Sequence, residues 1–322
     1  MKAIEVRRTG GPEVLELVER PTPEPGPGEV LVRQEAIGLN YIDTYHRSGF
    51  YKVDPPFVPG GEAAGVVQKL GHGVSRFAVG DRVAYAGGFG SYAGYRVLPA
   101  GRAVRVPDGI SSETAAAALL KGMTAEYLVR RTYPLRAGET ALVYAAAGGV
   151  GSILTPWAKA LDAVVIAVVG GTGKADIARG LGADHVIDHR AEDIAARVRE
   201  ITAGEGVRVV YDGVGSATFE ASLASLGRRG MLVSYGNASG PLPPLDVLEL
   251  SRRGSLYLTR PTLGDYVATT EDLDASARAL FEMILSGRVG IRIDRRYPLE
   301  QAAEAHRALE ASETTGSTLL VP

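Results

Sequence analysis

Between residues 140 and 259, short apolar runs alternate with amphipathic segments along the sequence. The apolar runs cover residues 140–146, 164–169, 185–188, 207–211, 231–234 and 255–259. Helical periodicity covers residues 149–161, 174–181, 193–202 and 218–226. Strands that are apolar on both faces and alternate with helices predict a parallel sheet, because helices must cover both of its faces. Six such strands are typical of a doubly wound α/β fold.

The two flanking regions follow other patterns. Residues 1 to about 120 contain short β-like runs at 30–33, 65–68, 81–85 and 95–98, broken by Gly/Pro clusters, which predict a compact, mostly β domain. After Pro261, two helices over 274–286 and 299–311 and a strand over 318–321 are too few for a third domain. We therefore expect two domains, one formed by 1–123 and 264–322 and the other by 124–263.

Charge and composition exclude several classes of protein. The 322 residues carry a net charge of −2 without any run of five basic residues, so nucleic acid and anionic membranes are disfavoured as partners. There is no cysteine, so disulfides, thiolate metal ligands and a cysteine nucleophile are absent. Residues 1–16 lack the apolar core of a signal peptide, and the longest strongly apolar stretch, 163–169, is far short of a membrane span. We expect a cytoplasmic protein.

Residues 145–151 read Ala-Ala-Ala-Gly-Gly-Val-Gly and join the first predicted strand to its helix. Gly148 and Gly151 meet the last two glycine positions of the G-x-G-x-x-G dinucleotide fingerprint, with Ala146 at the first. A glycine at 148 lets the backbone approach a pyrophosphate, and a glycine at 151 lets the helix pack on the strand. The helix N-terminus supplies free N–H groups to the phosphates. The alternative is a tight turn that binds nothing.

The end of the second predicted strand indicates which dinucleotide is bound. NAD sites usually place an acid about 20 residues further on, where it binds the ribose 2′-hydroxyl. Here the strand runs into Gly170, Gly171, Thr172, Gly173 and Lys174, with no acid at its end. A carboxylate there would repel a 2′-phosphate, whereas a lysine and a hydroxyl attract one. The sequence therefore predicts NADPH, although Lys174 is alternatively a solvated residue in the first turn of a helix.

The chain offers little for metal or nucleophilic catalysis. It has no G-x-S-x-G or H-E-x-x-H motif, and its five histidines form no pair with the spacing of metal ligands. A zinc alcohol dehydrogenase needs its metal to polarise an oxygen. A substrate reduced without that metal should be intrinsically electrophilic, as quinones and activated enones are.

These features occur together in one known family. The matching segments are 10–15, 36–45, 47–49, 80–83, 145–151, 209–212, 235–237, 254–261 and 316–320. In this combination the chain resembles the zinc-free quinone oxidoreductases, related to zeta-crystallin, of the medium-chain dehydrogenase/reductase superfamily. Zinc-containing relatives carry a Gly-His-Glu motif where this chain has Gly60, Gly61 and Glu62.

The resemblance implies a GroES-like catalytic domain, an inserted Rossmann domain that binds NADPH, and an active site in the cleft between them. It places Asn40, Tyr41, Asp43 and Tyr45 beside the nicotinamide and Tyr127 near the cofactor. Gly149 and Val150 would contact the pyrophosphate, and Gly170 to Lys174 would hold the adenosine 2′-phosphate. The other residues implied in the nucleotide site are Val214, Tyr235, Gly236, Asn237, Arg260, Pro261 and Thr262.

Several of these residues have plainer structural roles when taken singly. Asn40 suits a turn, Tyr45 suits aromatic packing, and Arg260 suits the end of a strand. We expect Asn40 and Tyr45 to be catalytic, orienting the substrate or a water that supplies the proton, without a dedicated general base. Two positions depart from the family pattern: His189 replaces a tyrosine beside the 2′-phosphate, and Ser312 replaces an arginine. A histidine at 189 can still donate a hydrogen bond, and it gains a charge below about pH 6.5. Loss of the arginine charge, which some members carry at position 312, predicts weaker NADPH binding.

Three functions follow as hypotheses. The first is reduction of quinones by NADPH, the second is NADPH-dependent reduction of enoyl or 2-alkenal substrates, and the third is a non-enzymatic nucleotide- or RNA-binding role, as in crystallin-like relatives. The run from Ser255 to Thr259 carries no charge and is the expected edge of the sheet. Such an edge favours pairing with a second copy, and the resemblance likewise implies a homodimer.

Overall fold

The computed structural model describes residues 1–322, which divide into two compact units. The first unit comprises Met1–Met123, Val267–Leu285 and Ile291–Pro322, and the second comprises Thr124–Tyr266 and Ser286–Gly290. Each unit has its own hydrophobic core. None of the helices combines the length and the apolar character needed to cross a bilayer.

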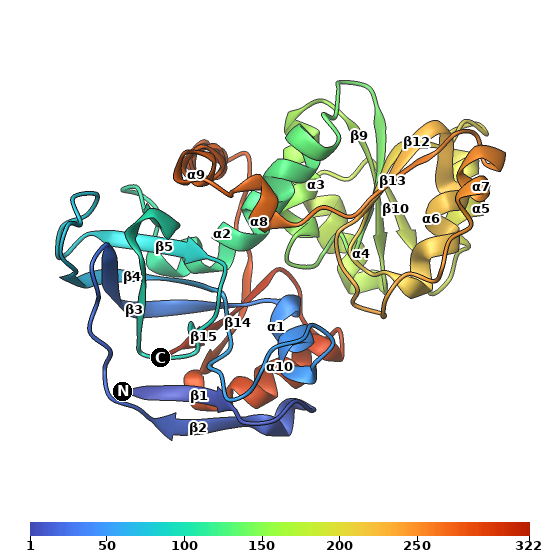
Figure 1. The fold of residues 1–322 in the computed structure, drawn as a ribbon. Helices are drawn as coiled ribbons and strands as arrows, with labels where there is room; N and C mark the ends of the chain where they lie inside the picture. Colours follow the sequence, from blue (N-terminus) through green and yellow to red (C-terminus); the bar gives the residue numbers. More distant parts are fainter. The chain divides into compact units, whose positions relative to one another are not determined.

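The second unit is built on a six-stranded sheet in the order β10-β9-β8-β11-β12-β13, with every neighbouring pair parallel (Figure 1). Because β8 is the first of these strands in sequence, this is the 3-2-1-4-5-6 order of the doubly wound dinucleotide fold. The prediction of a six-stranded parallel sheet is therefore confirmed. The strands are β8 (Thr140–Tyr144), β9 (Val164–Val169), β10 (His185–Asp188), β11 (Val207–Asp212), β12 (Leu226–Ser234) and β13 (Tyr257–Thr259).

Helices connect these strands, and each predicted helix is present: three are shorter than predicted, whereas α4 starts two residues earlier and ends one residue earlier. They are α3 (Gly151–Ala160), α4 (Thr172–Gly180), α5 (Ile194–Ile201) and α6 (Phe219–Ser225). The unit also contains a π-helical turn over Leu128–Thr132, α7 (Val247–Arg252) and α8 (Leu263–Tyr266), none of which the sequence pattern predicted. These three segments are short, so they show too few turns for a clear period.

Three strand boundaries in this unit were predicted wrongly. β8 stops at Tyr144 because Ala145 adopts φ 48°, and β13 starts only at Tyr257 because Ser255 adopts φ 58°. β12 begins at Leu226, where a helix end was predicted. Leu226 pairs with Val207 and Met231 with Val209, so residues 227–230 bulge out of the ladder and hide the strand in the sequence.

The first unit contains a seven-stranded sheet and a separate two-stranded sheet (Figure 1). β15, from the end of the chain, pairs antiparallel with β3, so the last segment of the sequence completes the sheet of the first unit. The strands are β1 (Lys2–Val6), β2 (Leu15–Glu19), β3 (Glu29–Leu39), β4 (Glu62–Leu70), β5 (Arg82–Ala86), β6 (Tyr95–Pro99), β7 (Ala103–Arg105), β14 (Ile293–Pro298) and β15 (Ser317–Val321).

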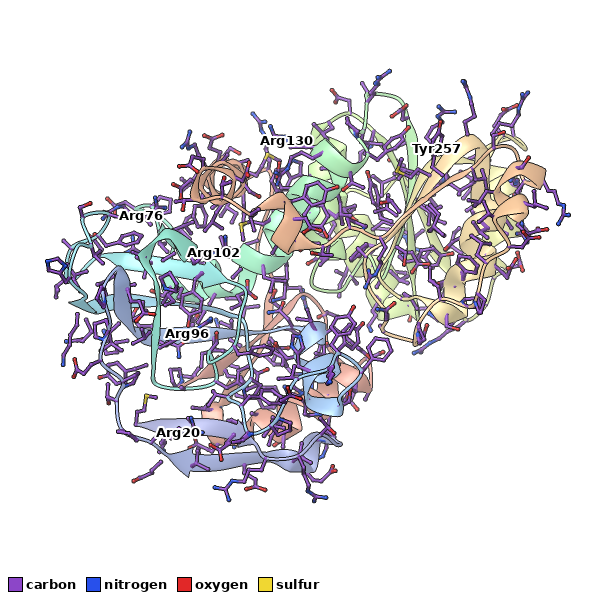
Figure 2. The ribbon with its side chains drawn as sticks, viewed as in Figure 1. Arg20, Arg76, Arg96, Arg102, Arg130 and Tyr257 are labelled. Atoms are coloured by element: carbon purple, nitrogen blue, oxygen red, sulfur yellow. The ribbon has the colours of Figure 1, made fainter.

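Four longer helices belong wholly or partly to this unit: α1 (Tyr41–Ser48), α2 (Ser112–Tyr127), α9 (Thr270–Leu285) and α10 (Ala302–Glu310). Arg76 and Arg102, whose side chains Figure 2 labels, attach the α9 region: Arg76 pairs with Asp274, and Arg102 donates to the Val267 carbonyl at 2.8 Å. α9 starts at Thr270, four residues before the predicted start, and α1 was not predicted at all.

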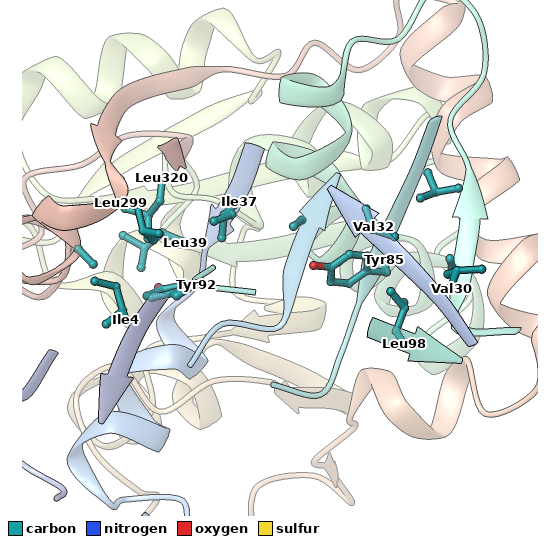
Figure 3. Packing of buried hydrophobic residues seen from close by; sticks show 14 of the residues in the cluster. Ile4, Val30, Val32, Ile37, Leu39, Tyr85, Tyr92, Leu98, Leu299 and Leu320 are labelled. Carbon is teal, nitrogen blue, oxygen red and sulfur yellow. The ribbon is translucent and has the colours of Figure 1, made fainter. Parts of the chain in front are cut away.

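The core of the first unit lies between its sheets and α10 (Figure 3). Ile37 and Leu39 of β3 pack with Leu299 and Leu320 from the end of the chain, and all four side chains are buried. Tyr85 and Tyr92 are buried in the same cluster. Residues from both ends of the sequence therefore support the C-terminal end of β3, where α1 begins.

Candidate active site and nucleotide-binding loops

The glycine-rich turn at 145–151 joins β8 to α3 at the carboxyl edge of the parallel sheet. The Gly148 N–H donates to the Ala145 carbonyl at 2.8 Å, which closes the turn. A Cβ at Gly151 would lie 2.7 Å from Ala146 Cα, so any larger residue would push α3 off the strand. At the start of α3 the Ser152 and Ile153 N–H groups donate to the Gly148 and Val150 carbonyls at 2.9 and 3.0 Å. The positive end of the helix dipole points toward this turn, which favours a phosphate there. Ala146, Gly148, Gly149, Val150 and Gly151 thus form one loop with the shape of a pyrophosphate cradle.

A second glycine-rich loop follows the neighbouring strand β9. Gly171 adopts φ 94°, and a Cβ at Gly173 would meet no atom within 4 Å, so open space borders the first turn of α4. Thr172 and Lys174 lie in the first turn of α4. Asp188 at the end of β10 accepts from the Gly171 N–H at 3.0 Å. This hydrogen bond is the largest cause that lowers the pKa of Asp188, so the acid nearest the loop is already engaged with backbone N–H groups.

His189 and Arg190 lie against this second loop. A Cβ at Gly170 would stand 2.8 Å from His189 Nε2 and 3.2 Å from Arg190 Nε, and one at Gly171 would stand 3.4 Å from Arg190 Nη1. The parallel pairing of Asp188 with Val169 explains this, because residues after β10 then run beside residues after β9. Sequence reasoning missed Arg190. Its position directly after His189 was the available signal.

The carboxyl ends of β11, β12 and β13 carry the rest of the predicted nucleotide site. The Asp212 carboxylate ends β11 and accepts from the Val214 and Gly215 N–H groups at 2.8 and 3.1 Å. A Cβ at Gly236 would stand 2.8 Å from Gly213 Cα, so the loops after β11 and β12 pack closely. Tyr235, Gly236 and Asn237 lie in the loop after β12, and Pro261 and Thr262 follow β13, Pro261 buried and Thr262 exposed.

Arg260 and Tyr127 have clear structural contacts in this unit. Arg260 Nη1 donates to the Ser234 carbonyl at 2.8 Å, so it joins the ends of β12 and β13. Tyr127, buried at the end of α2, stacks on Tyr266 with ring centroids 4.3 Å apart. Burial raises the pKa of Tyr127, so its hydroxyl stays protonated at neutral pH.

In the first unit, Asn40 occupies the junction of β3 and α1 and is buried. Its Nδ2 donates to the Gly38 carbonyl at 3.2 Å and to Glu62 Oε2 at 2.8 Å. Both partners accept only, so the amide nitrogen faces them, and Oδ1 is the accepting atom of the side chain. Asn40 and Asp43 form the capping box of α1, in which the Asn40 side chain accepts from the Asp43 backbone N–H, and the second lone pair of Oδ1 remains for a further donor. Asn40 can therefore recognise a donor, such as a water or a carboxamide N–H.

Glu62 is a fully buried carboxylate that orders this junction. Lys121 Nζ, also buried, donates to Glu62 Oε2 at 3.0 Å, and the Leu120 N–H donates to Oε1 at 2.6 Å. A buried charge pair persists only when further hydrogen bonds satisfy it, and here the amide of Asn40 is one of them. No group of three or more His, Asp or Glu side chains is arranged to hold a metal ion.

Asp43 and Tyr45 lie on α1 directly after Asn40. The Asn40 N–H donates to Asp43 Oδ2 at 3.0 Å, which caps the helix, and Tyr92 Oη donates to the same oxygen at 3.0 Å. Tyr45 is buried among Tyr41, Phe50 and Tyr51, with ring centroids 5.1 to 5.5 Å from its own. The N-cap and first turns of α1 thus bring Asn40, Tyr41, Asp43 and Tyr45 together within six residues of sequence.

Comparisons with known proteins identify the family. Residues 26–108 match the family described as alcohol dehydrogenase GroES-like domain, and residues 181–320 match the one described as zinc-binding dehydrogenase. A quinone oxidoreductase of Pseudomonas aeruginosa is 51% identical, covering 100% of this chain and 99% of its own. A quinone oxidoreductase of Escherichia coli, solved in complex with NADPH, superposes with a TM-score of 0.98 at 46% identity and full coverage of both chains. The chain belongs to the quinone oxidoreductase family.

One relative of this chain is named for a substrate that is not a quinone. A 2-haloacrylate reductase of Burkholderia is 41% identical over 98% of both chains. The resemblance inferred from the sequence motifs is confirmed, as is the GroES-like plus Rossmann fold. In this quinone oxidoreductase family member, Gly61 precedes the buried Glu62.

Proposed function

We propose that this protein reduces quinones with NADPH, by hydride transfer and without a metal. The observation that carries the proposal is the full-length similarity to a quinone oxidoreductase solved with NADPH, together with two glycine-rich loops at the carboxyl edge of the sheet. The fit to a dinucleotide rests on this chain's own residues, since Gly151 tolerates no Cβ and Gly173 borders open space.

Each loop has a distinct role in the proposal. The 145–151 turn and the N-terminus of α3 hold the pyrophosphate through backbone N–H groups. The 170–174 loop, with Lys174, His189 and Arg190, holds the 2′-phosphate through cationic and neutral donors. Val214, Tyr235 to Asn237, and Arg260 to Thr262 line the remaining nucleotide groove, and Tyr127 lies near the cofactor. NADPH, when bound, supplies the hydride.

In the first unit, we assign the nicotinamide end and the substrate to Asn40, Tyr41, Asp43 and Tyr45. Asn40 Oδ1 accepts a hydrogen bond and so orients a donor, either a water or the reduced substrate. The Tyr45 hydroxyl orients the substrate or the water that supplies the proton. A quinone positioned by these side chains accepts hydride without a Lewis acid.

Reduction of activated enones is the second candidate function. The observation that favours it is the 41% identity to a protein named 2-haloacrylate reductase, over 98% of both chains. An RNA-binding role is disfavoured by the net charge of −2. We propose that the protein acts in the cytoplasm as a homodimer that pairs through β13.

A steady-state assay separates these functions. NADPH oxidation is followed with a panel of quinones and a panel of enones, and Michaelis constants are measured for NADPH and NADH. We expect the highest kcat/KM with a quinone and a lower KM for NADPH. No oxidation with any acceptor would refute an enzymatic role, and a KM for NADH equal to or lower than that for NADPH would refute the cofactor assignment. Unchanged turnover of Tyr45→Phe would remove Tyr45 from the mechanism.

A further inference from the structure

A line of buried polar side chains crosses the first unit and ends at the helix cap of the proposed active site. Arg47 Nη1 lies 3.1 Å from His306 Nδ1, His306 Nε2 lies 2.9 Å from Tyr92 Oη, and Tyr92 Oη lies 3.0 Å from Asp43 Oδ2. All four residues are at most 2% exposed. They come from α1, α10 and the segment between β5 and β6, so only the fold brings them together.

The chemistry of these groups allows only one direction for the hydrogen bonds. A guanidinium has donors and no acceptor, so His306 Nδ1 must accept from Arg47 and carries no hydrogen. The hydrogen of the neutral ring is then on Nε2 and is donated to Tyr92 Oη. Tyr92 has a single hydrogen, which is left for Asp43 Oδ2. Each hydrogen bond in this series, from Arg47 through His306 and Tyr92, is therefore donated in the direction of Asp43.

Further hydrogen bonds hold both ends of this line of four side chains, Arg47 and Asp43, in place. Glu310 accepts from Arg47 Nη1 and Nη2 at 3.0 and 2.6 Å, and the Gly10 carbonyl accepts from Arg47 Nε at 3.1 Å. At the other end, Asp43 Oδ2 receives the Asn40 N–H in addition to the Tyr92 hydroxyl. In the capping box of α1 the Asn40 side chain in turn accepts from the Asp43 backbone N–H, so the orientation of Asp43 controls where the Asn40 amide lies.

We propose that His306 is a positioning residue of the active site, which acts through Tyr92 and Asp43 to hold the start of α1 and the side chain of Asn40. The inference rests on the proposed function for the role of Asn40. Because Oδ2 of Asp43 already receives two donors, a proton bound by this carboxyl resides on Oδ1. Ionised Asp43 accepts more strongly than the neutral acid, so the cap is firmest when Asp43 is ionised.

The charges around Asp43 are consistent with titration near neutral pH. Glu62 of β4 and Lys121 of α2 act on it with opposite sign, Tyr92 donates to it, and Arg47, His306 and Glu310 lie beyond Tyr92. Burial raises the pKa of Asp43 to about 7, against the hydrogen bonds from Asn40 and Tyr92. Burial, and next the charge of Arg47, lower the pKa of His306 to about 3, so its ring stays neutral and the chain keeps its direction.

The test follows the ionisation of Asp43 in the intact protein by NMR. Aspartate carboxyl carbons are labelled with ¹³C, and the Asp43 signal is identified by its loss in Asp43→Asn. We expect a wild-type midpoint near pH 7 and an increase of about one pH unit in Tyr92→Phe, because the carboxylate loses a donor. His306→Leu should raise the midpoint less, because Tyr92 remains but its orientation is released.

His306→Gln is the conservative variant, since its amide offers an acceptor to Arg47 and a donor to Tyr92. We expect this variant to keep the wild-type midpoint, and the exposed control His72→Leu to do the same. A purely structural role would lower the stability of both His306 variants without separating their midpoints. Equal midpoints in His306→Gln and His306→Leu, or an unchanged midpoint in Tyr92→Phe, would overturn the proposal.

The same variants connect the titration to the reaction. With NADPH and 1,4-benzoquinone, kcat/KM should fall below the Asp43 midpoint, and the fall should begin at higher pH in Tyr92→Phe. NADPH binding to the wild-type protein is measured separately by fluorescence. Absence of NADPH binding would refute the proposed function and leave the NMR result standing, whereas binding with unmoved midpoints would refute only the role of His306.

Discussion

At the scale of single residues, we expect the cationic side chains beside the 170–174 loop to determine the preference for NADPH over NADH. Arg190 lies beside Gly170 and Gly171, and no acid ends β9. Position 312 is a serine, so this chain lacks the arginine charge that the family resemblance attributes to some members. Arg190 is the residue of this loop that can offer two parallel N–H donors to a phosphate.

Arg190→Ala should weaken NADPH binding about 10-fold and leave NADH binding unchanged, because one charge-assisted hydrogen bond to the 2′-phosphate is lost. The dissociation constants are measured by nicotinamide fluorescence. Arg179→Ala is the matched control, since Arg179 lies on α4 but pairs with Asp176 at 2.7 Å. An equal loss for both nucleotides would show that Arg190 supports the fold of the loop and does not select the phosphate.

The buried pair of Glu62 and Lys121 makes a second prediction at this scale. Lys121→Met should destabilise the protein by about 3 kcal/mol, because it leaves Glu62 buried without its counter-charge. Adding Glu62→Gln should recover much of this loss, since a neutral amide keeps an acceptor for the Leu120 N–H. Urea unfolding measures both variants. A double variant less stable than Lys121→Met would contradict this explanation.

At the scale of elements, the turn from β8 into α3 is the connection that tolerates the least change. Gly151→Ala would place its Cβ 2.7 Å from Ala146 Cα, so the helix must move away from the strand. We expect a loss of about 2 kcal/mol in stability and more than 10-fold weaker NADPH binding. Gly180→Ala is the control, because a Cβ there meets no atom within 4 Å and alanine favours the helix. Unfolding curves and NADPH titration of both variants provide the measurement, and intact binding by Gly151→Ala would contradict the assignment of the turn.

The edge strand β13 is the element through which we expect dimerisation. It ends the six-stranded sheet, and Tyr257, labelled in Figure 2, is 56% exposed on it. Light scattering at micromolar concentration should give twice the chain mass of 33.8 kDa. Tyr257→Asp should give monomers, because like charges would meet across a two-fold axis. Val247→Asp, exposed on α7, should leave the dimer intact. A monomeric wild-type protein would refute the pairing.

At the scale of the whole molecule, two buried groups set opposite pH dependences of stability. The pKa of Asp43 is raised from 3.8 to about 7, so the folded state holds an extra proton between these values and stability falls as pH rises. The pKa of His306 is lowered from 6.5 to about 3, so the unfolded state holds the extra proton and stability falls as pH falls. Between about pH 4 and 6.5, each group changes the free energy of unfolding by about 1.4 kcal/mol per pH unit, and the two changes have opposite signs.

Single variants should reveal these two slopes. Relative to wild type, Asp43→Asn should lose stability on acidification from pH 7 to 4, because only the His306 contribution remains. His306→Gln should instead lose stability, relative to wild type, as pH rises from 3 to 6.5. Urea unfolding across this range measures both. Parallel pH profiles for the two variants would contradict the opposing contributions.

The sequence by itself determined the α/β architecture, the region 140–259 that contains the parallel strands, and the glycine turn at 145–151. These depend on interactions between near neighbours: alternation of strand and helix periods, and a close approach of α3 to β8 that leaves no room for a Cβ at Gly151. Short elements such as α1 and the bulged start of β12 escaped this reasoning, because their periods are too brief or interrupted.

Only the tertiary structure decided how the polar groups meet. Arg190 reaches the loop after β9 through the parallel register of β9 and β10, and His306 meets Arg47 across 259 residues of sequence. The Glu62–Lys121 pair and the direction of the hydrogen bonds toward Asp43 likewise require residues from several elements to be buried together. Local sequence carries no signal for such contacts, because their energies depend on burial and geometry that exist only in the folded chain.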